Sequence, residues 1–173
     1  LPIQSIAAHF WPSLCLTAAA ADAGPGCCHC SSIYCCSIYT PRSRILNPCR
    51  KLVALTWVSN VLGTINPVET LIPQLKEHGA TVVLDGAQGV PHLPTDVKKL
   101  GADFLAFSAH KMLGPTGIGV LWGKREILEK MPPCRFGGSM ILSVRQDRVR
   151  WAELPHKFEG GTPNISGVHG LGA

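Results

Sequence analysis

The sequence lacks three features that would each have indicated a class of protein. It has no run of about 20 apolar residues, the length that a membrane-spanning helix requires. It has no block of Lys and Arg, because its 16 basic residues are dispersed, so the net charge of +5 does not indicate a nucleic-acid surface. Only one cysteine follows residue 50, which argues against a disulfide framework across the chain. We therefore expect neither a membrane nor a nucleic-acid partner. The length of 173 residues is enough for one domain with a sizeable core.

The first 50 residues differ in composition from the rest. They contain a single acidic residue, Asp22. They also contain most of the cysteines: Cys15, Cys27, Cys28, Cys30, Cys35, Cys36 and Cys49. A zinc site is one interpretation, although CCHCSSIYCC lacks two separated ligand pairs, and a targeting peptide is another, although no basic segment precedes LCLTAAAADAG. We favour a third, that residues 1–50 are not native to the fold and are irregular and poorly ordered, because they show no sustained period.

From residue 51 onward, apolar runs alternate with helical patterns. We expect strands in LVALTWV, ATVVL, DFLAF and IGVLW. We expect helices over three ranges: 66–79, 96–100 and 124–131. Asn66 is the expected N-cap and Gly79 the expected C-cap of the first helix, and Thr95 is the expected N-cap of the second. The alternation predicts an α/β fold with a mostly parallel sheet and helices on both faces.

Polar side chains follow three of these strands directly. They are Asn60 after the first strand, Asp85 and Gln88 after the second, and Ser108, His110 and Lys111 after the third. Ligands of open α/β sheets bind at the carboxyl ends of the strands, so the three groups predict one site.

The residue types in this set favour pyridoxal phosphate as the ligand. Lysine binds its aldehyde as a Schiff base, a carboxylate keeps its pyridine nitrogen protonated, and small donors suit its phosphate. Other chemistries fit less well. The set lacks the ligand grouping of a metal site, a Ser108–His110 nucleophile pair lacks the GxSxG turn, and GPTGIG lacks the GK[ST] ending of a P-loop.

Several segments in a fixed order resemble a known family. DGAQ, FSAHKMLGPTGIGVLWG, FGGSMI and FEGGTPN resemble the pyridoxal-phosphate enzymes of aminotransferase class V, and within them the cysteine desulfurases and selenocysteine lyases. The resemblance covers about residues 51–173. It implies part of the large cofactor domain of fold type I over this range, with the first 50 residues as a separate segment.

The resemblance assigns a role to each candidate residue near the cofactor ring. Lys111 corresponds to the Schiff-base lysine and is the catalytic residue. Asp85 corresponds to the partner of the pyridinium nitrogen, and Gln88 to the residue that bonds the ring hydroxyl. Asn60 corresponds to a residue near the ring and the substrate carboxylate.

Three further residues correspond to phosphate ligands. Ser108 and His110 match the residues that bind the phosphate of the same subunit. Thr162 of the GTPN segment matches a residue that reaches the phosphate of the partner subunit's cofactor, so the resemblance implies a homodimer.

The implied activity is removal of sulfur from L-cysteine or selenocysteine. The products would be alanine and an enzyme persulfide, which a sulfur-acceptor protein would take for iron–sulfur cluster assembly, in the cytoplasm or in an organelle. Another class V lyase or transaminase, or an inactive truncated product, stays open. Family members are about twice as long, and the substrate-binding arginine and sulfur-accepting cysteine do not match any residue here. We therefore expect a fragment that is inactive alone, and we assign Cys134 no catalytic role.

Overall fold

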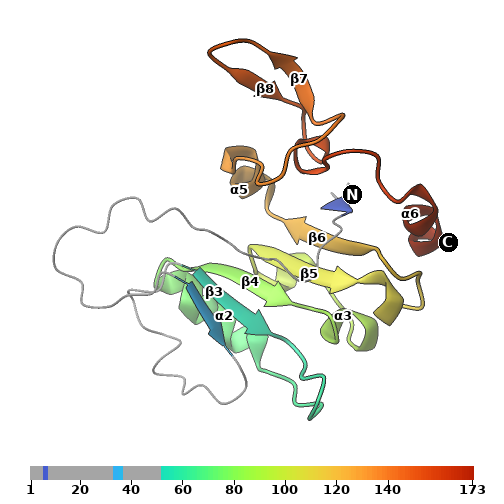
Figure 1. The fold of residues 1–173 in the computed structure, drawn as a ribbon. Helices are drawn as coiled ribbons and strands as arrows, with labels where there is room; N and C mark the ends of the chain where they lie inside the picture. The colour runs from blue at the N-terminus through green and yellow to red at the C-terminus, as the bar shows by residue number, and fades with distance from the viewer. Residues whose placement is uncertain (1–5, 8–32, 37–51) are drawn as a thin grey trace. The chain divides into compact units, whose positions relative to one another are not determined.

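The computed structural model of the chain describes residues 6–7, 33–36 and 52–173, and of residues 6–7 and 33–36 it describes the backbone alone (Figure 1). The side chains on which the zinc and targeting interpretations depend lie outside the described residues. The chain divides into two compact units: unit 1 comprises Leu1–Trp11 with Ala106–Ala173, and unit 2 comprises Pro12–Leu105.

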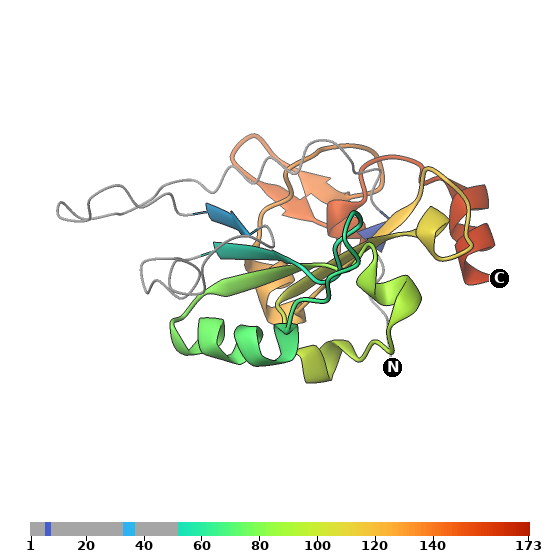
Figure 2. The ribbon, with the colours of Figure 1, turned by 90° about the horizontal axis from the view of Figure 1, so that it is seen from below.

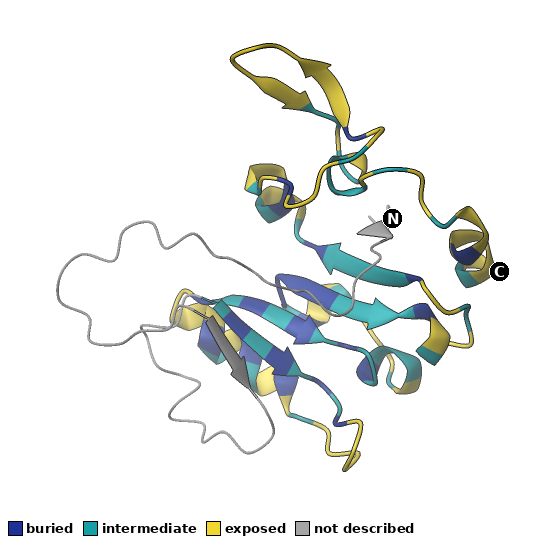
Figure 3. Ribbon diagram, viewed as in Figure 1, coloured by how far each residue is buried: buried dark blue, intermediate teal, exposed yellow. Residues whose placement is uncertain are grey.

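Unit 2 is built on a parallel sheet. Its strands are β2 (Ile33–Cys36), β3 (Leu52–Thr56) and β4 (Thr81–Asp85). Register pairs Val53 with Val82 and Leu55 with Leu84, and all four side chains are buried. Residues paired in register point to the same face, so these four form one buried face. The alternate residues of β3 and β4 are only half-buried, which Figure 3 shows as alternating colours along both strands.

Helix α2 (Val68–Glu77) packs along β4 and supplies part of the core of unit 2 (Figure 2). Its buried side chains recur at helical spacing: Val68, Ile72 and Leu75. The C-cap of the helix is His78, one residue before the predicted Gly79, which follows with a φ of 72° in the left-handed region. The N–H of Gly79 donates to Lys76 O and that of Ala80 to Leu75 O, which is the Schellman arrangement.

The predicted N-caps of two helices were each wrong by one residue. Asn66 does not cap α2, because its Nδ2 donates to Thr56 O at 2.6 Å, and Pro67 occupies the cap position without a side-chain bond. Helix α4 (Val97–Leu100) is capped by Asp96, whose Oδ1 accepts from the N–H groups of Lys98 and Lys99. Thr95 instead donates its hydroxyl to Leu93 O.

A buried carboxylate links α2 to the strands of unit 2. Asp103 is 1% exposed, and its Oδ2 accepts from Lys76 Nζ at 2.6 Å and from Val82 N at 2.8 Å. Its own N–H donates to Val82 O at 3.0 Å. Because Asp103 immediately precedes β5 (Phe104–Ser108), it fixes the start of that strand against the middle of β4.

Unit 1 begins within β5 and continues through elements that the sequence only partly predicted. The predicted elements are β6 (Gly119–Gly123) and α5 (Arg125–Lys130). The unpredicted ones are β1 (Ile6–Ala7), the hairpin of β7 (Ile141–Val144) and β8 (Val149–Trp151), the 3₁₀ turn η2 (His156–Phe158) and α6 (Ile165–Gly172). Strand β1 pairs antiparallel with β6.

The strands form two sheets, a six-stranded one in the order β1-β6-β5-β4-β3-β2 and the two-stranded β7-β8. The α/β fold with a parallel sheet is thus confirmed, with β1 as an antiparallel strand at one edge. The expectation of irregular structure before residue 51 did not foresee β1 and β2. Both pair through backbone groups, which need no apolar pattern in the side chains. Among the helices in the described part of the chain, none has the length and apolar character of a membrane span.

Candidate functional site

The carboxyl end of β4 presents Asp85 on the half-buried face of the sheet. Its main-chain carbonyl accepts from Trp57 N at 3.0 Å, and its Oδ1 accepts from Ala87 N at 2.9 Å. The second oxygen of the carboxylate makes no hydrogen bond with any residue that the structure describes. The turn that follows leads into α3 (Gly89–His92), with Gln88 at the N-cap position.

The structure brings two candidate residues into contact in unit 2. Gln88 Nε2 donates to Asn60 Oδ1, although the residues lie in separate loops. The Asn60 loop is closed by a bridge between Val58 and Ile65, and Ser59 Oγ accepts from the N–H groups of the two residues after Asn60. The two amide side chains thus form a pair that joins the two loops.

Gly89 fixes the position of Gln88. A Cβ on Gly89 would lie 2.4 Å from a ring carbon of Trp57, whose side chain is buried. Only glycine permits this close approach. The sequence reasoning did not identify Gly89, although the Gly directly after DGAQ is a signal for close backbone packing.

The carboxyl end of β5 presents Ser108 and the 3₁₀ turn η1 (Ala109–Lys111) in unit 1. Ala109 is fully buried and its carbonyl accepts from two later N–H groups, those of Met112 and Gly114, so the turn is anchored from within. Lys111 is half-buried, and its amine makes no hydrogen bond or ion pair with any residue that the structure describes. His110 is exposed.

The residue after this turn adopts an uncommon backbone conformation. Leu113 has a φ of 63° and its side chain is fully exposed. The left-handed region costs a branched residue about 1–2 kcal/mol, so the loop after Lys111 holds some strain. Gly114 follows, where a Cβ would approach Ala109 O to 3.1 Å.

Thr162 lies on the exposed segment before α6, also in unit 1. The N-cap of α6 is Asn164, whose Oδ1 accepts from Gly167 N at 3.0 Å. A Cβ on Gly117 would lie 3.8 Å from Asn164 Nδ2, so the GPTGIG loop and the GTPN segment approach each other within unit 1. The sequence reasoning missed Asn164, although Asn before an apolar helical segment is a start signal.

The candidate residues therefore belong to two groups. Asn60, Asp85 and Gln88 lie in unit 2. Ser108, His110, Lys111 and Thr162 lie in unit 1. No cluster of three metal-binding side chains occurs in the parts of the chain that the structure describes.

Comparison with known proteins gives the family. The statistical model of aminotransferase class V matches residues 39–173. The chain belongs to the aminotransferase class-V family. The match begins upstream of the boundary that the sequence predicted near residue 50.

Class-V relatives of known name are similar to this chain over most of its length. It is 59% identical over 123 residues to a protein named "Probable cysteine desulfurase" from Halalkalibacterium halodurans, with 71% of this chain and 30% of the relative covered. The solved cysteine desulfurase CsdA from Escherichia coli superposes with a TM-score of 0.71 at 45% identity, over 75% of this chain and 32% of that one. A solved cystine C-S lyase, C-DES, in complex with cysteine persulfide superposes with a TM-score of 0.66 at 29% identity, over 75% and 35% of the two chains. The chain thus spans about a third of the length of the class-V proteins that it matches.

Proposed function

We propose that this chain is part of a pyridoxal-phosphate-dependent cysteine desulfurase and that it supplies the cofactor-binding residues. The observation that carries the proposal is Lys111. It is a half-buried residue whose amine has no partner among the described residues, and it follows a strand closely in a chain 59% identical over 123 residues to a probable cysteine desulfurase. An amine in this state suits covalent chemistry better than a solvated surface lysine does.

The chemistry of the donor set fits pyridoxal phosphate. Among the described residues, only Ala87 N binds the Asp85 carboxylate, and it binds Oδ1, so the second oxygen can accept from a protonated pyridine nitrogen. Gln88 and Asn60 offer amide groups for the ring hydroxyl and the substrate carboxylate. Ser108 and His110, with Thr162 from a second copy in a homodimer, offer donors for the phosphate.

In this proposal the bound cofactor supplies an electron sink for the substrate, and the protein residues orient it and move protons. Asp85 would keep a proton on the ring nitrogen. Lys111 would hold the cofactor aldehyde, and its amine would serve as general base and general acid toward the substrate carbon.

The overall reaction would transfer one sulfur atom. L-cysteine and an enzyme thiol would give alanine and an enzyme persulfide, and selenocysteine would react in the same way with its selenium. We assign Cys134, which is exposed in unit 1, no role as the accepting thiol, because it does not match the sulfur-accepting cysteine of the family. A sulfur-acceptor protein would then take the sulfur for iron–sulfur cluster assembly, in the cytoplasm or an organelle. Within this chain, residues 51–173 would form part of the pyridoxal-phosphate-binding domain.

Covalent trapping tests the assignment of Lys111. The purified chain is incubated with pyridoxal phosphate, reduced with borohydride and digested, and the modified peptide is sequenced by mass spectrometry. We expect the pyridoxyl group on Lys111 and no stable adduct in Lys111→Ala. Lys124→Ala is the matched control, because it removes a lysine from the same unit and is expected to leave the adduct unchanged. Modification spread evenly over many lysines would refute the assignment.

A second candidate function is a class V carbon–sulfur lyase. The similarity to the C-DES lyase, at 29% identity, favours this alternative over a transaminase. Product analysis separates the two in a holoenzyme extended to the length of its relatives: a desulfurase releases alanine from cysteine, and a lyase of this kind releases persulfide from cystine.

For residues 51–173 alone we expect no turnover, since the substrate arginine and the accepting cysteine of the family match no residue here. Alanine release from cysteine by this shortened chain would contradict that expectation.

A further inference from the structure

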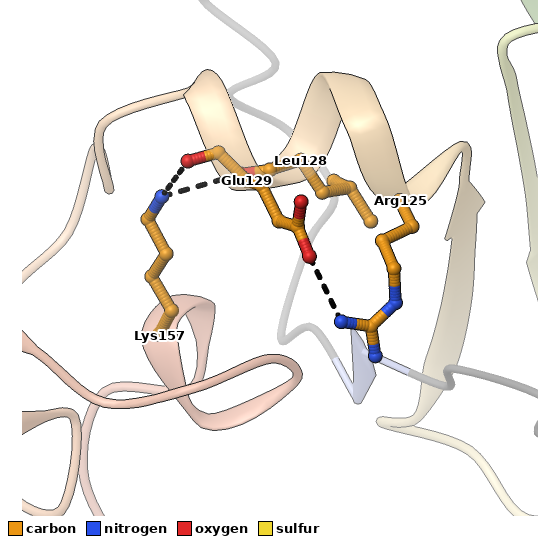
Figure 4. Close-up of polar contacts among 4 residues, drawn as sticks. All are labelled: Arg125, Leu128, Glu129 and Lys157. Carbon is orange, nitrogen blue, oxygen red and sulfur yellow. Dashed lines mark hydrogen bonds and ion pairs between the residues drawn. The ribbon is translucent and has the colours of Figure 1, made fainter.

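The segment before Thr162 is anchored at two places, and the first is a lysine. Lys157 lies in η2, and its Nζ donates to Glu129 O at 2.8 Å and to Leu128 O at 3.3 Å (Figure 4). These carbonyls belong to the last turn of α5, where backbone oxygens lack helical partners. A cation also interacts favourably with the negative end of a helix. Lys157 thus attaches η2 to α5 within unit 1.

The second anchor is a close approach between two pairs of glycines. Gly161 N donates to Gly138 O at 2.9 Å. A Cβ on Gly137 would lie 2.6 Å from Gly160 C and 2.7 Å from Gly161 N, so two backbones touch where no side chain fits. Gly161 has a φ of 89°, which turns the chain directly before Thr162. Below this contact, Met140 is fully buried and its Sδ accepts from Gly137 N.

Between the two anchors the chain has little freedom. Lys157 N donates to Glu153 O, and Glu159 N donates to His156 O, so the turn that carries Lys157 is itself hydrogen-bonded. Only Phe158 and Glu159 separate Lys157 from the glycine contact. A displacement of η2 from α5 is therefore transmitted to Thr162 through a short, constrained segment.

Thr162 has the properties of a residue that is held for an external ligand. Its side chain is exposed, and its hydroxyl makes no hydrogen bond with any other described residue. A single threonine hydroxyl binds a phosphate oxygen well only when its place is fixed beforehand, because ordering it during binding would consume part of the gain.

We propose that Lys157 is a positioning residue for Thr162: by binding the C-terminal carbonyls of α5, it fixes the segment from which Thr162 reaches the cofactor phosphate in a second copy of the chain. This inference rests on the proposed function. Lys157 itself touches neither cofactor nor substrate in this role. It contributes to cofactor affinity only through Thr162.

A double-mutant cycle tests this dependence in the full-length chain. Lys157→Met removes the donors and keeps the length of the side chain, and Lys157→Arg keeps a donating cation. Thr162→Val removes the hydroxyl. Glu129→Gln is the matched control, because it breaks the exposed ion pair with Arg125 at 2.9 Å but keeps the Glu129 carbonyl that Lys157 binds (Figure 4). The dissociation constant of pyridoxal phosphate is measured by spectroscopic titration of the apoprotein.

We expect Lys157→Met to raise this dissociation constant about threefold to tenfold, the range for loss of one hydrogen bond. Lys157→Arg restores most of the affinity, and Glu129→Gln leaves it unchanged. In the Thr162→Val background, Lys157→Met causes no further loss. An equal loss in both backgrounds, or no loss in either, would overturn the proposal, because a lysine that only stabilises the fold would act independently of Thr162.

Amide hydrogen exchange gives a readout that does not depend on the cofactor. The N–H of Gly161 should exchange faster in Lys157→Met than in the wild type and Glu129→Gln, since its bond to Gly138 O depends on the anchored segment. If Gly161 N–H exchanges faster in Lys157→Met but the cofactor affinity is unchanged, Lys157 only stabilises the fold and the proposal is refuted. If the wild type binds no pyridoxal phosphate and traps none on Lys111, the proposed function fails instead and the positioning role falls with it.

Discussion

Removal of the Asp103 carboxylate should be the most destabilising polar substitution in unit 2. Asp103→Ala leaves Val82 N without its acceptor in the interior, at a cost of about 1–3 kcal/mol. Loss of the ion pair with Lys76 adds a smaller destabilisation of about 0–1 kcal/mol. The Lys76 side chain is 38% exposed, so water replaces part of the interaction. Together they predict a loss of about 1–4 kcal/mol in the free energy of unfolding.

Graded variants separate the two contributions. Asp103→Asn keeps an oxygen for Val82 N and loses the charge, and Lys76→Met removes only the amine, so each should cost about 1 kcal/mol. Lys99→Met is the control, because its ion pair with Asp96 spans 4.0 Å between exposed side chains and should contribute nothing measurable.

The assay is equilibrium urea unfolding of the full chain, followed by far-ultraviolet circular dichroism. We expect Asp103→Ala to lose the most stability. Asp103→Asn and Lys76→Met should each lose less, and Lys99→Met should lose none. If Asp103→Ala unfolds no more easily than Lys99→Met, the buried hydrogen bond to Val82 N does not stabilise the fold and the reasoning fails.

Four further substitutions test the packing, the helix cap and the backbone strain by thermal unfolding. Gly89→Ala should lower the stability by about 1–3 kcal/mol, because its Cβ would overlap the Trp57 ring, and unchanged stability would mean that the ring moves freely. Asp96→Ala should lower the free energy of unfolding by about 1 kcal/mol, and Thr95→Ala should leave it almost unchanged. The reverse order would show that Thr95, the residue that the sequence predicted, is the N-cap of α4. Leu113→Gly should raise the stability by up to about 1 kcal/mol through relief of its left-handed backbone, whereas a loss would show that the exposed side chain contributes packing in solution.

The central strands and α2 could be predicted because their signals are local. The apolar runs that became β3 and β4 need no information from elsewhere in the chain, and Gly79 marks the end of α2 by its freedom to adopt a positive φ. The cap at Asn66 failed for the opposite reason. Its amide binds the carbonyl of Thr56 in the preceding strand, a partner that only the folded chain supplies.

The hairpin of β7 and β8 could not be predicted from its pattern. Both strands are mostly exposed, so no alternation of apolar and polar residues distinguishes an inner from an outer face. The connecting residues from Arg145 to Arg148 contain no Gly or Asn, which usually mark tight hairpin turns.

The sequence could predict those residues of the candidate site that directly follow a strand. Asp85, Ser108 and Lys111 lie at or after the carboxyl ends of β4 and β5, where the rule for α/β sheets places ligand-binding residues. The rule could not indicate that Gln88 donates to Asn60, since a contact between two loops depends on how each loop closes. The roles of these residues remain predictions for the trapping and titration experiments.

The outermost strands of the large sheet have a consequence for any shortened form of the protein. Strand β1 pairs with Val120 and Leu121 of β6, and β2 pairs with Leu52 to Leu55 of β3. A chain that starts at residue 51 lacks both and presents two open rows of backbone N–H and C=O groups. Such bare edges pair readily with other chains. We therefore expect β1 and β2 to protect these sheet edges against aggregation. A chain without the two strands should scatter light at concentrations at which a solution of the full chain does not.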